Sequence, residues 1–314
     1  MVDSKQQWKG WLYLAPALVL LLVFTVWPMF NTIRMAFLEG YNGLKAAGGA
    51  TFKFGIANFV KVIQYKGFLQ CLKVTVLLCV ITVPISTLLA LLIAVCLNSI
   101  KPLSKFLQTI FFLPYVTNSI AIGMVFAAMF NIVGTAIGGE NELVVTAGIV
   151  NNVIEFFGGT KINWINAGSS ELANMTVLVI YIVWNALPFK ILILLGGLQS
   201  VNRQYYDAAK VDGTSRWRTF WRITVPLLSP MIIYVVITGF IGGFKEYSSI
   251  VGIFGEGMGP AGQEKRLNTM VGFIYDALEK NNQGRASAAA LILFVIILLV
   301  TLLNLYVSKK KVHY

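Results

Sequence analysis

The sequence predicts an all-α transmembrane protein with six membrane-spanning helices. Hydrophobic residues make up 57% of its 314 residues and charged residues only 12%, whereas charged residues make up about a quarter of ordinary soluble domains. Several apolar runs are also long enough to cross the ~30 Å hydrocarbon core of a bilayer as helices. The predicted spans are residues 11–33, 74–97, 109–132, 172–197, 223–244 and 286–308.

The spans are almost free of charge, and Lys190 is the one charged residue in the core of any of them. The first apolar run follows Lys5 and Lys9, as the core of a signal peptide would, but it is too long for one and is interpreted as a retained helix. Residues 1–314 are therefore treated as a single transmembrane domain.

The segments between the spans have their own local signals. Apolar residues at helical spacing predict a short interfacial helix over 56–64. Leu113–Pro114–Tyr115 predicts a kink or an irregular start in the third span, because proline removes a helical hydrogen bond. One or two surface helices are expected within 133–171, and Gly196–Gly197 is expected to end the fourth span.

The distribution of basic residues predicts the orientation. The net charge of +12 is attributed to basic loops near an anionic leaflet, with no nucleic-acid partner. The short connection 98–108 and the tail Lys309–Lys311 are basic, which favours a cytoplasmic location for both. With six spans, both termini are then cytoplasmic.

No catalytic or metal site is expected on this chain. Cys71, Cys79 and Cys96 lie in or beside the second span at spacings that suit neither a disulfide nor a metal, so they are interpreted as packing residues. The sole histidine, His313, lies in the tail. The chain also contains no Gly-Lys dipeptide and hence no phosphate-binding loop, so it is not expected to hydrolyse ATP.

The polar stretch YYDAAKVDGTSRWRTFWRITVPLLSP, residues 205–230, predicts a helix–turn–helix elbow on the cytoplasmic surface. Asn202 can cap the first helix, Asp212–Gly213 can break it, and Thr214 or Ser215 can cap the second. In that second helix, three aromatic residues at i, i+3 and i+4 suit a helix at the membrane interface. They are Trp217, Phe220 and Trp221.

This stretch resembles the EAA signature of importer-type ABC transporter permeases, which reads E-A-A, three residues, G, nine residues, I-x-L-P. Asp207–Ala208–Ala209, Gly213, Ile223 and Pro226 match its spacing, with aspartate in place of glutamate and Val225 in place of leucine. Three further elements resemble the larger membrane subunit of maltose-type transporters within the carbohydrate-uptake permeases, although Asn202 replaces a proline common after the second. They are residues 111–115, 196–200 and 257–260.

The resemblance implies a type I permease fold and a subunit of an ATP-driven sugar importer in a bacterial or archaeal cell membrane. Its implied partners are a second homologous permease, an ATPase dimer that holds ATP and Mg, an extracytoplasmic binding protein, the sugar and membrane lipid. Residues 198–226 would form the coupling segment that docks on the ATPase. The residues implied in coupling are Tyr206, Asp207, Ala208, Ala209, Asp212, Gly213 and Pro226.

Each implied coupling residue type has a physical reason. Small Ala208 and Ala209 allow close approach to an ATPase cleft, and Gly213 permits the chain reversal. Asp207 can pair with a basic group or complement its own helix N-terminus. Pro226 is expected to start the fifth span.

The implied sugar site involves four residues inside or beside the spans. Tyr115 and Ser119 match sugar-site positions of the maltose-type family, and Asn185 is a candidate from the fourth span. Glu246 retains a polar pocket position of the family, whereas two other such positions fall on Gly239 and Gly243, which suggests a wider cavity.

Structural roles are the alternatives for these residues. Tyr115 can hydrogen-bond a neighbouring helix, Ser119 its own i−4 carbonyl, and Asn185 another span. Glu246 can pair with Lys245 at the surface, and Lys190 is expected to snorkel inward without binding ligand.

Two other functions are weighed against sugar import. One is ATP-driven import of glycerol phosphate or another polyol, which would favour arginines in the spans. The other is ion-coupled secondary transport, which would favour carboxylates there. The spans contain neither arginine nor an internal carboxylate.

Overall fold

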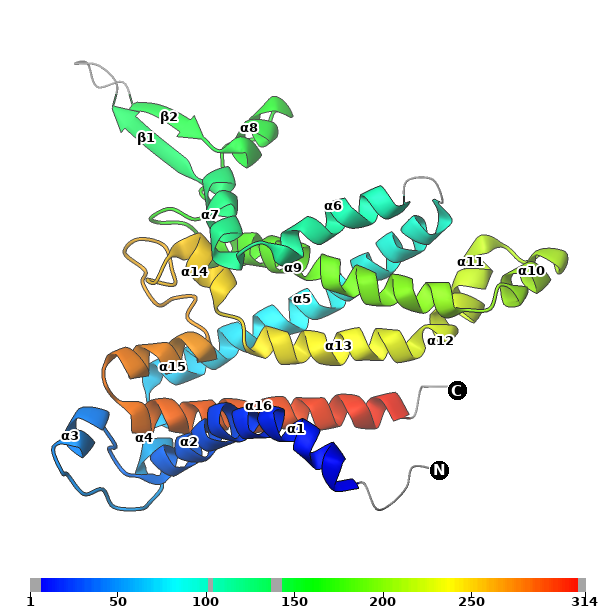
Figure 1. Cartoon of the computed structure of the whole chain (residues 1–314). Helices are drawn as coiled ribbons and strands as arrows, with labels where there is room; N and C mark the ends of the chain where they lie inside the picture. Colours follow the sequence, from blue (N-terminus) through cyan, green and yellow to red (C-terminus); the bar gives the residue numbers. More distant parts are fainter. Residues whose placement is uncertain (1–6, 101–103, 137–142, 310–314) are drawn as a thin grey trace. The chain divides into compact units, whose positions relative to one another are not determined.

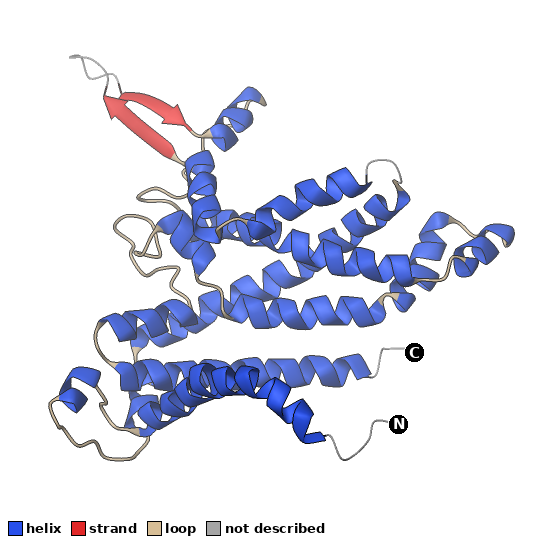
Figure 2. Cartoon of the chain, viewed as in Figure 1, coloured by secondary structure: helices blue, strands red, loops and turns tan. Residues whose placement is uncertain are grey.

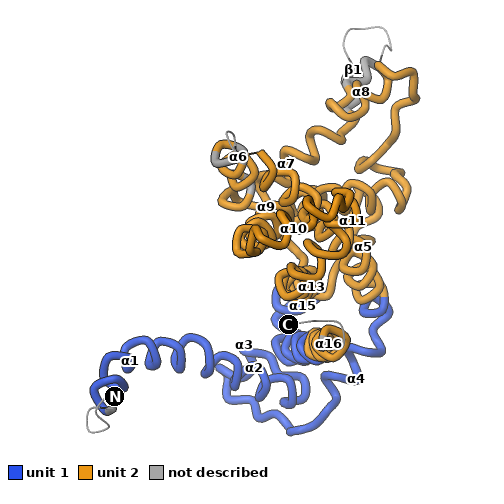
Figure 3. The backbone as a smooth tube through the Cα atoms, turned by 90° about the vertical axis from the view of Figure 1, so that its right-hand side faces the viewer, with its two compact units in different colours: residues 1–69, 271–295 blue, residues 70–270, 296–314 orange. Residues whose placement is uncertain are grey.

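The computed structural model describes residues 7–100, 104–136 and 143–309, and helices dominate this part of the chain (Figures 1 and 2). Lys5, Lys101, Lys310, Lys311 and His313, which enter the sequence predictions, lie outside the described residues. The chain divides into two compact units (Figure 3). Unit 1 is residues 1–69 and 271–295, and unit 2 is residues 70–270 and 296–314.

Unit 1 combines the N-terminal span with part of the last one. Its elements are α1 (Gln7–Leu21), the π-helical stretch η2 (Leu22–Val26), α2 (Trp27–Phe37), α3 (Gly43–Ala47), α4 (Ala57–Ile63), nearly all of α15 (Met270–Glu279) and the first half of α16 (Gln283–Lys309). Asn58 is buried on α4, where its side chain donates to the carbonyls of Ala36 and Leu38 and accepts from the Gly40 N–H. These hydrogen bonds hold the turn after α2 against α4. Helix α4 confirms the short helix predicted over 56–64.

Unit 2 contains the remaining elements. They are α5 (Lys66–Ser99, from Gln70 on), α6 (Ser104–Val116), α7 (Ser119–Phe130), β1 (Ile132–Ala136), β2 (Leu143–Ala147), α8 (Ile149–Phe156), α9 (Glu171–Ser200), α10 (Gln204–Val211), α11 (Arg216–Thr219), η3 (Phe220–Thr224), α12 (Val225–Leu227), α13 (Ser229–Phe244) and α14 (Ser248–Phe254). Two apolar clusters form its core. One joins α5, α7, α9 and α14, and the other joins α5, α9 and α13.

Four helices among the described residues are long and apolar enough to cross a membrane, and a bent pair makes a fifth. The four agree with the predicted first, second, fourth and sixth spans, and the bent pair with the fifth. The third predicted span, 109–132, is interrupted close to Leu113–Pro114–Tyr115, where a kink or an irregular start is predicted. It is broken after Val116 into α6 and α7, because Asn118 starts a new helix by accepting the N–H groups of Ile120 and Ala121 at 2.9 and 3.4 Å.

The segment after α7 contains one helix, as predicted, and also a β-hairpin that was not predicted. Residues 132–136 pair antiparallel with residues 143–147, with Ile132 opposite Ala147. One short helix, α8, follows this hairpin. Both strands contain valine and threonine, whose side chains branch at Cβ and favour extended backbone.

The glycine pair at the end of the fourth span does not terminate it. Helix α9 continues through Gly196–Gly197 to Ser200. A Cβ on Gly197 would lie 2.8 Å from Met231 Cγ and 3.0 Å from Leu228 Cδ2, so this glycine permits close packing of α9 against α13. Its small size, not its conformational freedom, explains its place.

Candidate functional site

Residues 198–226, the predicted coupling segment and called so below, fold as the predicted elbow. Helix α10 ends at Val211, and Gly213 follows in a left-handed conformation with φ +64°, which glycine adopts without the steric cost that a side chain brings. Ser215 then caps α11 by accepting the Arg218 N–H at 3.4 Å. Asn202 Oδ1 accepts the Gln204 N–H at 3.0 Å where α10 starts. The turn positions predicted at Gly213 and Ser215 are confirmed. The N-cap residue of α10 is Arg203 and not Asn202 as predicted, and Asn202 bonds the first helical N–H from one residue earlier.

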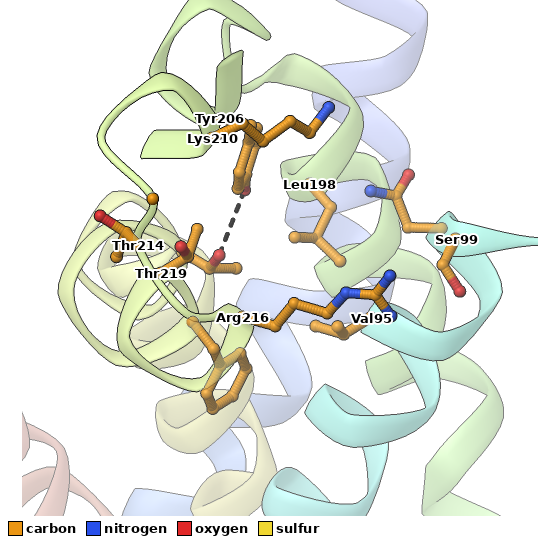
Figure 4. Close-up of a pocket in the computed structure, with 12 residues that line it drawn as sticks. Val95, Ser99, Leu198, Tyr206, Lys210, Thr214, Arg216 and Thr219 are labelled. Carbon is orange, nitrogen blue, oxygen red and sulfur yellow. Dashed lines mark hydrogen bonds between the residues drawn. The ribbon is translucent and has the colours of Figure 1, made fainter. Parts of the chain in front are cut away.

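A cavity of about 800 Å³ lies between this elbow and the ends of α5 and α9 (Figure 4). The Tyr206 hydroxyl lies 3.3 Å from Thr224 Oγ1, and this hydrogen bond, drawn in Figure 4, ties α10 to η3 across the bend. Arg216 extends from the elbow toward Val95 of α5 (Figure 4). One hydrogen bond therefore joins the two arms of the elbow, and the space between the elbow and the ends of α5 and α9 is a cavity.

The two alanines of the motif lie on different faces of α10. Ala208 is exposed, whereas Ala209 is 6% exposed and faces the protein. Asp207 lies in the first turn of α10, where a negative charge complements the helix dipole, and it pairs with Lys210 at 3.2 Å on the exposed surface. Of the two alanines, Ala208 is available for close approach by another chain. Asp212 follows α10 as its exposed C-cap residue.

The fifth span does not start at Pro226 as predicted. Pro226 belongs to the three-residue α12, and the segment 216–227 meets α13 at a bend of 68°. Pro230 lies in the first turn of α13, where its missing N–H costs no helical hydrogen bond. The side chains of Trp217, Phe220 and Trp221 form one aromatic cluster beside this bend, with ring centroids 5.0–6.2 Å apart.

A second cavity, here called the central cavity, lies among the helices of unit 2 and measures about 300 Å³. It brings together Tyr115, Asn185 and Glu246 of the predicted sugar site. The Tyr115 ring stacks on Phe189 with centroids 6.0 Å apart and planes 17° apart, so two aromatic rings lie together at the wall. The full lining is Thr82, Val83, Ser86, Tyr115, Ile182, Asn185, Ala186, Phe189, Lys190, Thr238, Gly239, Gly242, Gly243 and Glu246.

Ser119 lies behind this wall and does not bond its own i−4 carbonyl. Its hydroxyl lies 3.1 Å from the Tyr181 hydroxyl and accepts from Asn185 Nδ2 at 3.2 Å. Tyr181 is fully buried, and its hydroxyl also donates to the backbone carbonyl of Ser119. The network ties α7 to α9 and fixes the Asn185 amide at the cavity wall.

The far wall is formed by the glycine-rich end of α13. A Cβ on Gly243 would lie 2.6 Å from Cys79 Sγ, so α13 approaches α5 too closely for a side chain there. This glycine therefore serves helix packing, which the sequence interpretation of a wider cavity did not foresee. Glu246 accepts the N–H groups of Tyr247 and Ser249 at 3.1 Å each, so its carboxylate is already partly satisfied.

The comparisons with known proteins identify the family and the fold of this chain. The family described as binding-protein-dependent transport system inner membrane component matches residues 86–313. The chain belongs to this family. It is the inner-membrane permease component of a binding-protein-dependent ABC importer.

The permease is similar along nearly its whole length to characterised members. It is 30% identical to the lactose transport permease LacF of Rhizobium radiobacter over 94% of this chain and 91% of that protein. It is 28% identical to the sn-glycerol-3-phosphate transport permease UgpA of Agrobacterium fabrum over 97% of this chain and 96% of that protein. A solved bacterial alginate ABC transporter has the same fold, with a TM-score of 0.80, 21% identity and coverage of 99% and 98% of the two chains.

Lys190 lies inside the permease, as the sequence predicts, but its contacts were not predicted. Lys190 is buried at 3% exposure and lines the central cavity, where it binds α5 through three hydrogen bonds. Lys190 is the one charged residue in the core of any predicted span. Its isolation in an apolar run is the signal that could have identified it.

Proposed function

We propose that the permease translocates a sugar or oligosaccharide through a path that includes the central cavity. The observation that carries the proposal is the wall formed by Tyr115, Phe189 and Asn185. Aromatic faces stack on the C–H faces of sugars, and an amide can donate to and accept from sugar hydroxyls. The names of LacF and other relatives, such as the arabinooligosaccharide permease AraP of Bacillus subtilis, support this class of cargo.

Energy for transport comes from partner subunits in this proposal. An ATPase dimer binds ATP and Mg and engages the coupling segment through the exposed face of α10, where Asp207, Ala208 and Lys210 lie. A second homologous permease completes the path, and an extracytoplasmic binding protein delivers the cargo. The permease itself performs no catalysis and holds no cofactor, and both its termini lie in the cytoplasm.

One experiment tests cargo and coupling together. The complex is purified, and its ATPase activity is measured with the binding protein and a panel of glycans, amino acids and metal ions. Glycans are expected to stimulate ATP hydrolysis. Stimulation by amino acids or metal ions, with none by glycans, would contradict the assignment of a sugar cargo.

Asp207→Arg tests the docking role within the same complex. The Asp207 side chain is 67% exposed, so the change leaves membrane insertion intact while it removes the negative charge from the docking face. Loss of co-purification with the ATPase is expected. Glu155→Arg is the matched control, because Glu155 is also an exposed carboxylate paired with a lysine, on α8, and it should leave ATPase association unchanged.

A second cargo class, a phosphorylated polyol such as glycerol phosphate, is favoured by one observation. Lys190 brings a basic group to the central cavity, and a cation attracts an anionic cargo. The name of UgpA points to the same class. sn-Glycerol 3-phosphate therefore belongs in the panel, and a stronger response to it than to any glycan would replace the sugar assignment.

A further inference from the structure

Lys190 makes an unusual set of contacts for a lysine in a membrane helix. Its Nζ donates to Ser86 Oγ at 2.7 Å, to Thr87 Oγ1 at 2.9 Å and to the Val83 carbonyl at 3.2 Å. All three acceptors lie on one stretch of α5. The amine is therefore held at a fixed point beside the central cavity and does not extend to a membrane surface.

The contacts also favour the charged form of the amine. Ser86 uses its hydroxyl proton to bond the Thr82 carbonyl at 2.6 Å, and Thr87 uses its own to bond the Val83 carbonyl at 2.7 Å. Both hydroxyls therefore present lone pairs to Nζ, and the Val83 carbonyl can only accept. Three acceptors match the three N–H groups of an ammonium, whereas a neutral amine has only two.

No carboxylate among the described residues forms an ion pair with this ammonium. Glu246 lines the same cavity, but its carboxylate accepts two backbone N–H groups at the start of α14. An unpaired ion within a membrane span is costly, and a neutral hydrogen-bonding side chain could join the two helices at lower cost.

The ammonium lines the central cavity beside a glycine of α13. A Cβ on Gly239 would lie 3.1 Å from Lys190 Nζ, so the helix packs closely there and any larger residue would crowd the ammonium. The longest of the three bonds, to the Val83 carbonyl, is also the easiest to exchange, because that carbonyl keeps its bond from Thr87. A ligand oxygen can therefore reach the ammonium at the cost of one weak bond.

We infer that Lys190 recognises a carboxylate on the transported saccharide, so that the cargo contains an acidic sugar of the uronate type. This inference rests on the proposed function and names the chemical class of its cargo. One ammonium neutralises one carboxylate but only half of a phosphate dianion, and Glu246 in the same cavity adds one further negative charge in either case. The stacked Tyr115 and Phe189 rings on the same wall can receive the face of the sugar ring.

The test uses matched ligands on the whole complex in proteoliposomes, with its binding protein saturated. The probes are uronate disaccharides, the same disaccharides after reduction of the carboxyl to an alcohol, and sn-glycerol 3-phosphate. Uptake and ATPase stimulation are compared between wild type and variants. Because the binding protein is the same throughout, a change in selectivity between variants reports on the permease.

Lys190→Met keeps the length of the side chain and removes its charge. It is expected to lower uronate uptake by about tenfold, the loss typical of one charged hydrogen bond, while uptake of the reduced disaccharide changes little. Lys190→Arg retains the charge and should preserve the preference for the uronate. Gly239→Ala leaves Lys190 in place and crowds its ammonium, so it should lower the preference even if Lys190→Met fails to assemble.

Three outcomes would overturn the inference while leaving sugar import intact. These are a wild-type complex that transports only the reduced disaccharides, a Lys190→Met variant that loses both uptakes by the same factor, and a Gly239→Ala variant with unchanged preference. A preference for sn-glycerol 3-phosphate would mean that Lys190 recognises a phosphate and not a carboxylate. A complex that responds to no saccharide or polyol at all would instead contradict the proposed function.

Discussion

The coupling segment and the central cavity are built in opposite ways, although both lie in unit 2. The coupling segment is one continuous stretch whose shape follows from local contacts at Asn202, Gly213 and Ser215. The central cavity is assembled from α5, α6, α9 and α13, and one of its contacts joins Lys190 to Val83 across 107 positions of sequence. Local chemistry therefore controls the first, and helix packing controls the second.

The difference teaches where each region should be sensitive to mutation. In the coupling segment, backbone conformation at one residue determines the fold, and most side chains are exposed for another chain to contact. In the central cavity, added or removed atoms act on neighbouring helices. Backbone changes should therefore damage the coupling segment most, and changes of volume should damage the cavity most.

Gly213→Pro should have the largest effect. Proline fixes φ near about −65°, whereas Gly213 has φ +64° and donates its N–H to the Lys210 carbonyl at 3.1 Å. We expect normal membrane insertion, loss of co-purification with the ATPase and abolished uptake. Gly196→Ala is the control, because a Cβ there meets nothing within 4 Å. Uptake that survives Gly213→Pro would show that the bend is not needed for coupling.

Gly243→Ala should have the next largest effect, through packing alone. The added methyl group would lie 2.6 Å from Cys79 Sγ, and such overpacking costs about 1–3 kcal/mol of stability. A lower Tm is expected for this variant and no change for Gly242→Ala, since a Cβ on Gly242 meets nothing within 4 Å. Cys79→Ala should relieve the clash in the double variant. If it does not, the close approach of α5 and α13 is not the cause.

The same contrast explains what the sequence could predict. Gly213, Ser215 and the aromatic cluster of the coupling segment follow from turn chemistry and helical spacing, and the structure confirms them. The break before α7 had an equally local signal, because Asn118 is a strong N-cap residue. The polar and aromatic candidates Tyr115, Asn185 and Glu246 do meet at one cavity, but their role in binding stays a prediction.

Roles that depend on a distant partner could not be predicted in this way. Glycine often ends a helix, but Gly197 instead allows α9 to pack closely against Met231 of α13. The roles of Gly243 and Lys190 are likewise set by residues of α5, more than 100 positions away. A single sequence does not reveal which helix faces which, so these functions of glycine and lysine became visible only when the helices were packed.

Ser119→Ala should have a smaller effect, confined to the cavity. It removes the side-chain hydrogen bonds to Tyr181 and Asn185 at 3.1 and 3.2 Å, whereas the Tyr181 hydroxyl keeps its bond to the backbone carbonyl of residue 119. A loss of about 1 kcal/mol in stability is expected, together with weaker uptake because the Asn185 amide is no longer fixed. Thr117→Ala is the control, since its hydroxyl bonds only its own helix at Leu113. If both variants had the same effect, the hydrogen bonds of Ser119 to Tyr181 and Asn185 would have no special role.

Lys210→Ala should have the smallest effect on stability and separates the two regions most sharply. The ion pair with Asp207 is 3.2 Å long, but the two side chains are 79% and 67% exposed, and solvent and salt screen such pairs strongly. An unchanged Tm is therefore expected at both low and high salt, while co-purification with the ATPase weakens because a charge is lost from the docking face. A fall in Tm as large as that of Ser119→Ala would mean that side-chain contacts hold the elbow together. The coupling segment would then be built like the cavity, and the conclusion that local backbone contacts determine its shape would be wrong.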